Sequence, residues 1–90
     1  MEEVLFESEQ RASREAIASY LETVAANLRA GEALTLRAGG EELTLDPPAE
    51  ATFEVKAERE TNGGPDELSV EFELEWNEGE ESSSSGLEIE

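Results

Sequence analysis

The sequence predicts an α+β domain in which one helix packs on the apolar face of an antiparallel meander sheet of about five strands. Three observations predict this class. Apolar residues between positions 13 and 31 recur with the period of a helix, whereas several other segments alternate polar and apolar residues as strands do. Glycine pairs, Gly39-Gly40 and Gly63-Gly64, lie between alternating segments, as in β-hairpins. The predicted order is strand, helix and four strands.

Residues 4–8 (VLFES) predict a short opening strand, which could join its own sheet or that of a second copy. The helix follows, with Ser13 as a cap that accepts from first-turn amides and Gly31 as a left-handed stop. Glu15 and Arg29 complement the two ends of its dipole. One stripe of the helix is apolar and holds Ile17, Leu21, Val24, Ala25 and Leu28.

The two hairpins can be predicted at the level of residue pairs. The turn at Gly39-Gly40 places Leu36 opposite Leu43 and Arg37 opposite Glu42, and residues 46–48 (DPP) end the second strand. Residues 51–60 alternate again, and a loop at 61–66 leads to the strongest alternation of the chain, residues 67–76 (ELSVEFELEW). A symmetric hairpin pairs Val55 with Phe72, Phe53 with Leu74, Lys56 with Glu71 and Glu54 with Glu73.

The domain is expected to span residues 1–77, followed by a flexible acidic and serine-rich tail at 78–90. The chain carries 24 acidic and 6 basic residues, and its net charge is -18. Such a charge opposes folding in dilute buffer but is screened over roughly 3 Å in molar salt, which predicts a cytoplasmic protein of an organism with a high-salt interior.

The same composition excludes several function classes. The chain has no cysteine and no histidine, so zinc sites and thiol chemistry are excluded. Five arginines and one lysine are too few to form a nucleic-acid surface. The longest apolar runs are too short to span a membrane, and the first residues lack the basic start of a secretory signal. We expect no cofactor, no metal, no nucleic acid and no membrane among its partners.

Several segments together resemble the amphi-Trp domain family, small haloarchaeal proteins named for a terminal amphipathic strand that ends in tryptophan. The matching segments are residues 5–9 (LFESE), 13–21 (SREAIASYL), 28–36 (LRAGEALTL) and 68–76 (LSVEFELEW). The resemblance covers nearly all of the expected domain and supports the high-salt cytoplasm. It implies no activity and no catalytic residues.

Few residues suggest chemistry. Glu71, Glu73 and Glu75 lie on one strand face at the separation of glycosidase carboxylates, but an open row of solvated glutamates ionises together, so we expect no enzyme. Trp76 is either a core residue at the edge of the helix–sheet interface or an anchor for a partner, and Tyr20 lies beside the helix stripe. The candidate partner or pocket contacts are Tyr20, Trp76, Phe72 and Phe6.

Two functions remain open at this point. The first is a non-enzymatic interaction module that self-associates, as a dimer, and presents a sheet edge or outer face to another protein. The alternative is a regulatory domain that binds a small molecule in a pocket between helix and sheet, near Tyr20 and Trp76.

Overall fold

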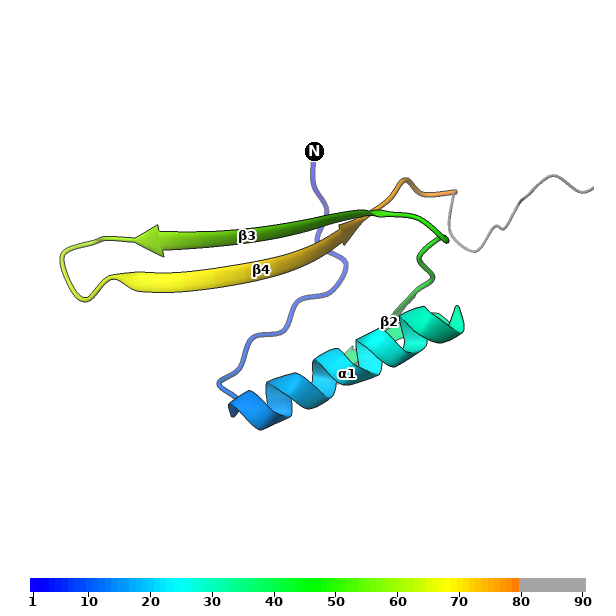
Figure 1. The fold of residues 1–90 in the computed structure, drawn as a ribbon, viewed down its shortest axis with the longest axis horizontal. Helices are drawn as coiled ribbons and strands as arrows, with labels where there is room; N and C mark the ends of the chain where they lie inside the picture. The colour runs from blue at the N-terminus through cyan, green and yellow to red at the C-terminus, as the bar shows by residue number, and fades with distance from the viewer. Residues whose placement is uncertain (80–90) are drawn as a thin grey trace, which may run out of the picture.

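The fold is α+β, as predicted, with one helix followed by four strands (Figure 1). The computed structural model describes residues 1–79. The strands form two separate antiparallel hairpins, β1–β2 and β3–β4, so the prediction of a single five-strand meander is wrong. A physical reason lies between the hairpins, where residues 46–51 include Pro47 and Pro48, which cannot donate to a strand ladder. The predicted tail at 78–90 lies almost wholly outside the described residues.

The helix α1, Arg14–Ala30, begins and ends where the sequence predicts. The Ser13 hydroxyl oxygen accepts a hydrogen bond of 3.0 Å from the Ala16 amide. At the other end Gly31 adopts a φ of 71°, and its amide donates to the Leu28 carbonyl at 3.2 Å. The Asn27 side chain then donates to the Ala33 carbonyl at 3.2 Å, which ties the end of the helix to the start of β1.

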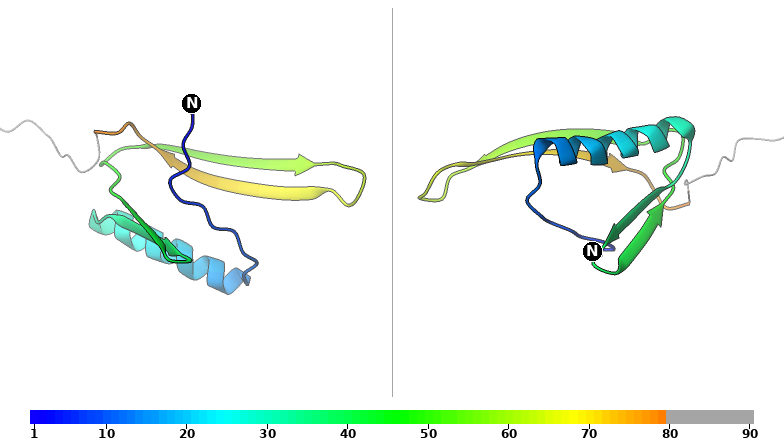
Figure 2. Two further views of the ribbon diagram at one scale, coloured as in Figure 1. Left: turned by 180° about the vertical axis from the view of Figure 1, so that it is seen from behind. Right: turned by 90° about the horizontal axis from the view of Figure 1, so that it is seen from below.

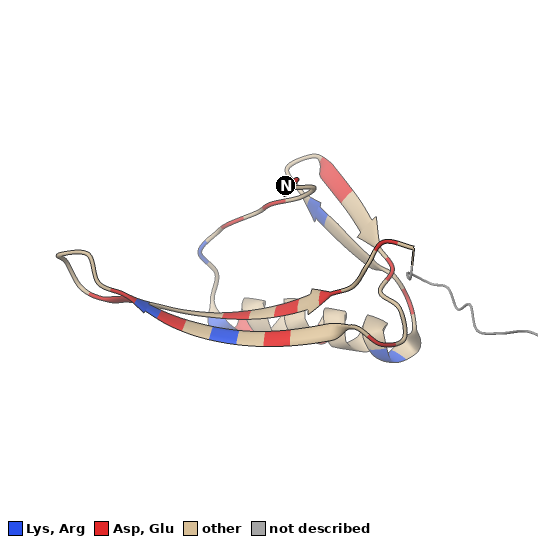
Figure 3. Cartoon of the chain, turned by 90° about the horizontal axis from the view of Figure 1, so that it is seen from above, with Lys and Arg blue, Asp and Glu red and all other residues tan. Residues whose placement is uncertain are grey.

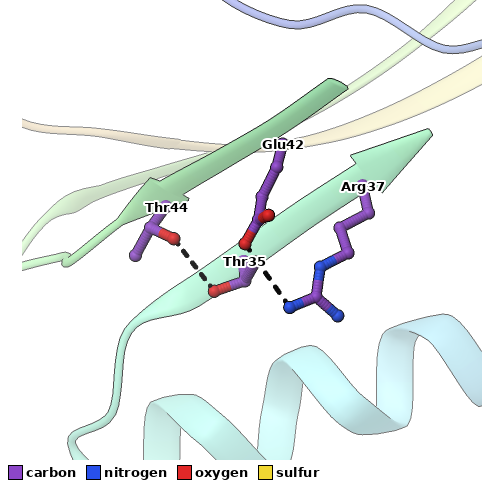
Figure 4. A network of polar contacts seen from close by, with 4 residues as sticks. All are labelled: Thr35, Arg37, Glu42 and Thr44. Carbon is purple, nitrogen blue, oxygen red and sulfur yellow. Dashed lines mark hydrogen bonds and ion pairs between the residues drawn. The ribbon is translucent and has the colours of Figure 1, made fainter. Parts of the chain in front are cut away.

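The hairpin of β1 (Leu34–Ala38) and β2 (Glu41–Leu45) has the predicted register. Its turn places Gly39 and Gly40 at φ values of 56° and 85°, the conformation that primed turns require. The leucines are half-buried, whereas the polar side chains between them are exposed. Across the polar face the Thr35 and Thr44 hydroxyls lie 3.1 Å apart, and an Arg37 guanidinium nitrogen lies 3.4 Å from a Glu42 carboxylate oxygen (Figure 4).

The second hairpin joins β3 (Thr52–Glu60) and β4 (Glu67–Glu75), and its register is also as predicted. Val55 lies opposite Phe72, and Glu54 lies opposite Glu73. Every residue of β3 is exposed, and in β4 only Leu74 is half-buried. The sequence pattern therefore predicted the pairing of this hairpin correctly, but not its surroundings.

The predicted opening strand at residues 4–8 is absent: the structure describes residues 1–13 as a segment without regular secondary structure (Figure 2). Val4 and Leu5 are exposed there, and Phe6 is half-buried. Strand conformation depends on a neighbouring strand that accepts the backbone hydrogen bonds, and within residues 1–79 no strand edge is paired with this segment.

The helix contacts β1 and no other strand within residues 1–79, so the expected packing of the helix on a five-strand sheet is not observed. None of these residues is buried. The radius of gyration is 16.5 Å, against about 12 Å for a compact chain of this size. The accessible surface is 8287 Å², against about 5200 Å² for a folded monomer of this mass. Residues 1–79 of a single copy therefore form no closed core.

Candidate functional site

One surface of the β3–β4 hairpin is apolar along almost its whole length. Strand residues alternate between faces, and the register then determines which side chains of the two strands share a face. We call this surface the hairpin apolar face, and it consists of Phe53, Val55, Ala57, Leu68, Val70, Phe72 and Leu74. Arg59, opposite Leu68, closes its distal end and lies 3.9 Å from Asp66.

Except for the half-buried Leu74, the large side chains of the hairpin apolar face are open to solvent. Phe53 is 62% exposed, Leu68 is 70% exposed, and Phe72 is 55% exposed. The rings of Phe53 and Phe72 stack, with their centroids 6.4 Å apart and their planes inclined by 8°. Contiguous exposed apolar surface of this kind marks a site of contact with another surface. The hairpin apolar face is therefore the candidate functional site.

The opposite face of the same hairpin is acidic, with a single lysine. Figure 3 marks the acidic and basic residues along the two strands. Lys56 lies opposite Glu71, as predicted, but its ion pair is with Glu58 on its own strand, at 3.7 Å. The faces thus differ in chemistry over the whole length of the hairpin, and we call the second one the acidic face. It consists of Thr52, Glu54, Lys56, Glu58, Glu60, Glu67, Ser69, Glu71, Glu73 and Glu75.

Like charges meet on the acidic face where Glu54 lies opposite Glu73. A hydrogen bond with the Glu54 carboxyl raises the pKa of Glu73, and repulsion from Glu75 and Glu71 raises it further. These carboxylates are open to water, so they lack the sheltered cleft that a general acid needs. In residues 1–79 no three potential metal ligands cluster, and no helix is long and apolar enough to cross a bilayer.

The candidate contacts from the sequence fall in three places. Phe72 lies at the centre of the hairpin apolar face. Tyr20 is 59% exposed on α1, and its hydroxyl accepts a hydrogen bond of 3.3 Å from the Gln10 side-chain amide. Tyr20 also lines an open hollow of about 660 Å³, together with residues from the N-terminal segment and β1. Phe6 belongs to that same N-terminal segment.

Trp76 follows the last residue of β4 and is half-buried. It lines a different open hollow, of about 630 Å³, where the chain enters β3 and leaves β4. The other residues of this hollow are Glu50, Ala51, Thr52, Glu75 and Asn77. The structure thus places Tyr20 and Trp76 beside two separate hollows, and does not bring them into one pocket between helix and sheet.

The sequence predicts the apolar side of the second hairpin but places it in a closed core. Most of its residues, Phe53, Val55 and Val70 among them, are therefore not among the predicted contacts. A signal was present in the sequence: residues 46–51, with two adjacent prolines, separate the helix and first hairpin from the second hairpin. That interruption favours two units over one continuous sheet.

The comparisons with known proteins agree with the resemblance drawn from the sequence. Searches of curated proteins and of solved structures each found no match. The family model of the Amphi-Trp domain matches residues 1–90, the whole chain. The closing amphipathic strand and its terminal tryptophan are the β4 strand and Trp76 described above. The chain belongs to the Amphi-Trp domain family.

Proposed function

We propose that this protein is a non-enzymatic self-association module, and that a second copy of the chain covers the hairpin apolar face. The observation that carries the proposal is the exposure of that face: Val55, Val70 and Phe72 are each more than half exposed. Apolar side chains stabilise a fold only when they leave water, and a single copy leaves them in it.

The distribution of charge on the hairpin is compatible with a second copy on the apolar face. All the carboxylates of β3 and β4 lie on the acidic face, opposite to the apolar one. Association through the apolar faces leaves both acidic faces in solvent, where salt can screen them. Two-fold pairing also covers both apolar faces at once, as is usual for homodimers.

The proposed setting is a cytoplasm rich in salt. With a net charge of -18 per copy, association in dilute buffer brings two strongly repelling chains together. At molar ionic strength the Debye length falls to about 3 Å, and the repulsion between acidic faces is largely screened. The apolar contribution is undiminished by salt, so the balance shifts toward the dimer.

A pair of variants at adjacent positions tests this proposal. Val70 lies on the hairpin apolar face and Ser69 on the acidic face, so Val70→Asp and Ser69→Asp add the same charge to opposite faces. In molar potassium chloride, light scattering after size exclusion should give a dimer for Ser69→Asp and a monomer or unfolded chain for Val70→Asp. If both variants have the mass of the unaltered protein, this face is not the interface and the proposal is wrong.

A further inference from the structure

We infer that the occupant of the hairpin apolar face is the helix α1 of the second copy, and that the exchange is reciprocal. In this arrangement each hairpin receives the partner's helix while its own helix covers the partner's hairpin. The inference rests on the proposed self-association and specifies which surfaces meet. It starts from a second exposed apolar surface, on α1.

The apolar residues of α1 divide into two sides. Ala16, Val24 and Asn27 are the half-buried residues of the helix, and its contacts are with β1. At 100° per residue, Ile17, Leu21 and Leu28 lie about a quarter turn away from them. We call these three residues the helix flank, and they are 46%, 50% and 40% exposed. The helix therefore has apolar surface left over after β1 is covered.

The carboxylates of α1 lie away from the helix flank, and the one charged residue in line with it, Arg14, is at the first position of the helix. At 100° per residue, Glu15 and Glu22 lie about a third of a turn away from the helix flank, and both are exposed. Placing the helix flank on an apolar strand face therefore buries no carboxylate of this helix. A helix laid across one face of an antiparallel sheet is also a common two-layer arrangement.

A helix as the occupant covers both exposed apolar surfaces of each copy, whereas a second hairpin covers only one of them. The exposed fractions of the hairpin apolar face correspond to roughly 500 Å² of apolar side chain per copy. Two hairpins face to face would bury about 1000 Å² in total, at the lower limit for a stable interface. The helix flank adds roughly 250 Å² of exposed apolar side chain per copy, which the exchange covers and a pair of facing hairpins leaves in water.

The connection between the two halves of the chain explains why the partner copy supplies the helix. Residues 46–51 join β2 to β3 and contain Pro47 and Pro48, whose fixed φ stiffens the segment. Within residues 1–79, α1 makes no contact with β3 or β4 of its own chain (Figure 2). A short, stiff connection that keeps two complementary surfaces of one chain apart favours their exchange between copies.

Because the sequence contains no cysteine, introduced cysteines report the contact without interference. We would prepare Leu21→Cys with an affinity tag and Val70→Cys without one, mix them in low salt, and transfer the mixture to molar potassium chloride. A bis-maleimide reagent then links cysteines that lie close together. A matched control replaces Val70→Cys by Ser69→Cys, which has the cysteine one residue away on the acidic face.

The reciprocal arrangement predicts a covalent heterodimer of Leu21→Cys and Val70→Cys, and its loss when either cysteine is omitted or when Ser69→Cys replaces Val70→Cys. A dimer in which Val70→Cys links to itself while the heterodimer is absent means that hairpins face each other, and the helix exchange is wrong although self-association stands. If the same mixture sediments as a monomer before cross-linking, both the self-association and the helix exchange are wrong. If it sediments as a dimer that the reagent does not link, only the helix exchange is wrong.

Discussion

Phe53 illustrates at the residue scale the apolar surface that residues 1–79 leave exposed. Its ring stacks on that of Phe72 and is otherwise 62% exposed. The alternating pattern of residues 51–60 predicted which face this ring occupies, because neighbouring strand residues point to opposite faces. The pattern could not predict what lies over the ring, since burial depends on segments distant in sequence or on another molecule.

Truncating Phe53 distinguishes a covered face from an exposed one. If a second copy covers the ring, Phe53→Ala should lower the free energy of unfolding by about 3–5 kcal/mol, as for other buried phenylalanines. If the ring stays in solvent, the change should be within about 0.5 kcal/mol. The measurement is denaturant unfolding in molar potassium chloride, at equal protein concentrations because dimer stability depends on concentration. Thr52→Ala, on the acidic face, is the control and should have little effect.

At the scale of elements, local signals were sufficient for α1 and for both hairpins. The cap at Ser13, the stop at Gly31 and the turn at Gly39-Gly40 each depend on neighbouring residues, and the structure has all three where the sequence predicts them. The predicted strand at residues 4–8 is absent because such a segment has no local stabilisation and needs a partner strand. The predicted assembly of the hairpins into one sheet was also wrong, because the alternation of residues along a strand does not say which strands lie next to each other.

The facing glutamates of β3 and β4 give this hairpin a pH dependence. Because the pKa of Glu73 is raised above its ordinary value of 4.5, the folded hairpin binds this proton more tightly than the unfolded chain does. The resulting stabilisation is complete below pH 4.5 and is lost as the pH rises through the raised pKa. Glu54 faces Glu73 across the strands, and Glu71 and Glu75 flank it.

We therefore expect Glu73→Gln to stabilise the protein at neutral pH in low salt, and to lose this advantage on acidification below the ordinary glutamate pKa. Thermal unfolding at a series of pH values measures the difference between the variant and the unaltered protein. Glu22→Gln, which removes one negative charge from an exposed position of α1, is the control for net charge. An advantage of Glu73→Gln that does not change with pH, or that Glu22→Gln shares, contradicts this origin.

At the scale of the whole molecule, the charge and the open shape have a common consequence. None of residues 1–79 is buried, and the net charge is -18, so a single copy combines little apolar stabilisation with strong self-repulsion. In the proposed dimer, association supplies the burial that one copy lacks, and salt screens most of the repulsion. We therefore expect folding, dimer formation and salt to be coupled in this protein.

The most direct test of self-association is the mass of the unaltered chain by sedimentation equilibrium in molar potassium chloride, over a wide range of protein concentration. We expect a species of twice the 9.8 kDa of one chain, which dissociates and unfolds as the salt is diluted. A folded species of 9.8 kDa at the highest concentration would contradict the account, because one copy would then be stable with its hairpin apolar face uncovered by a partner.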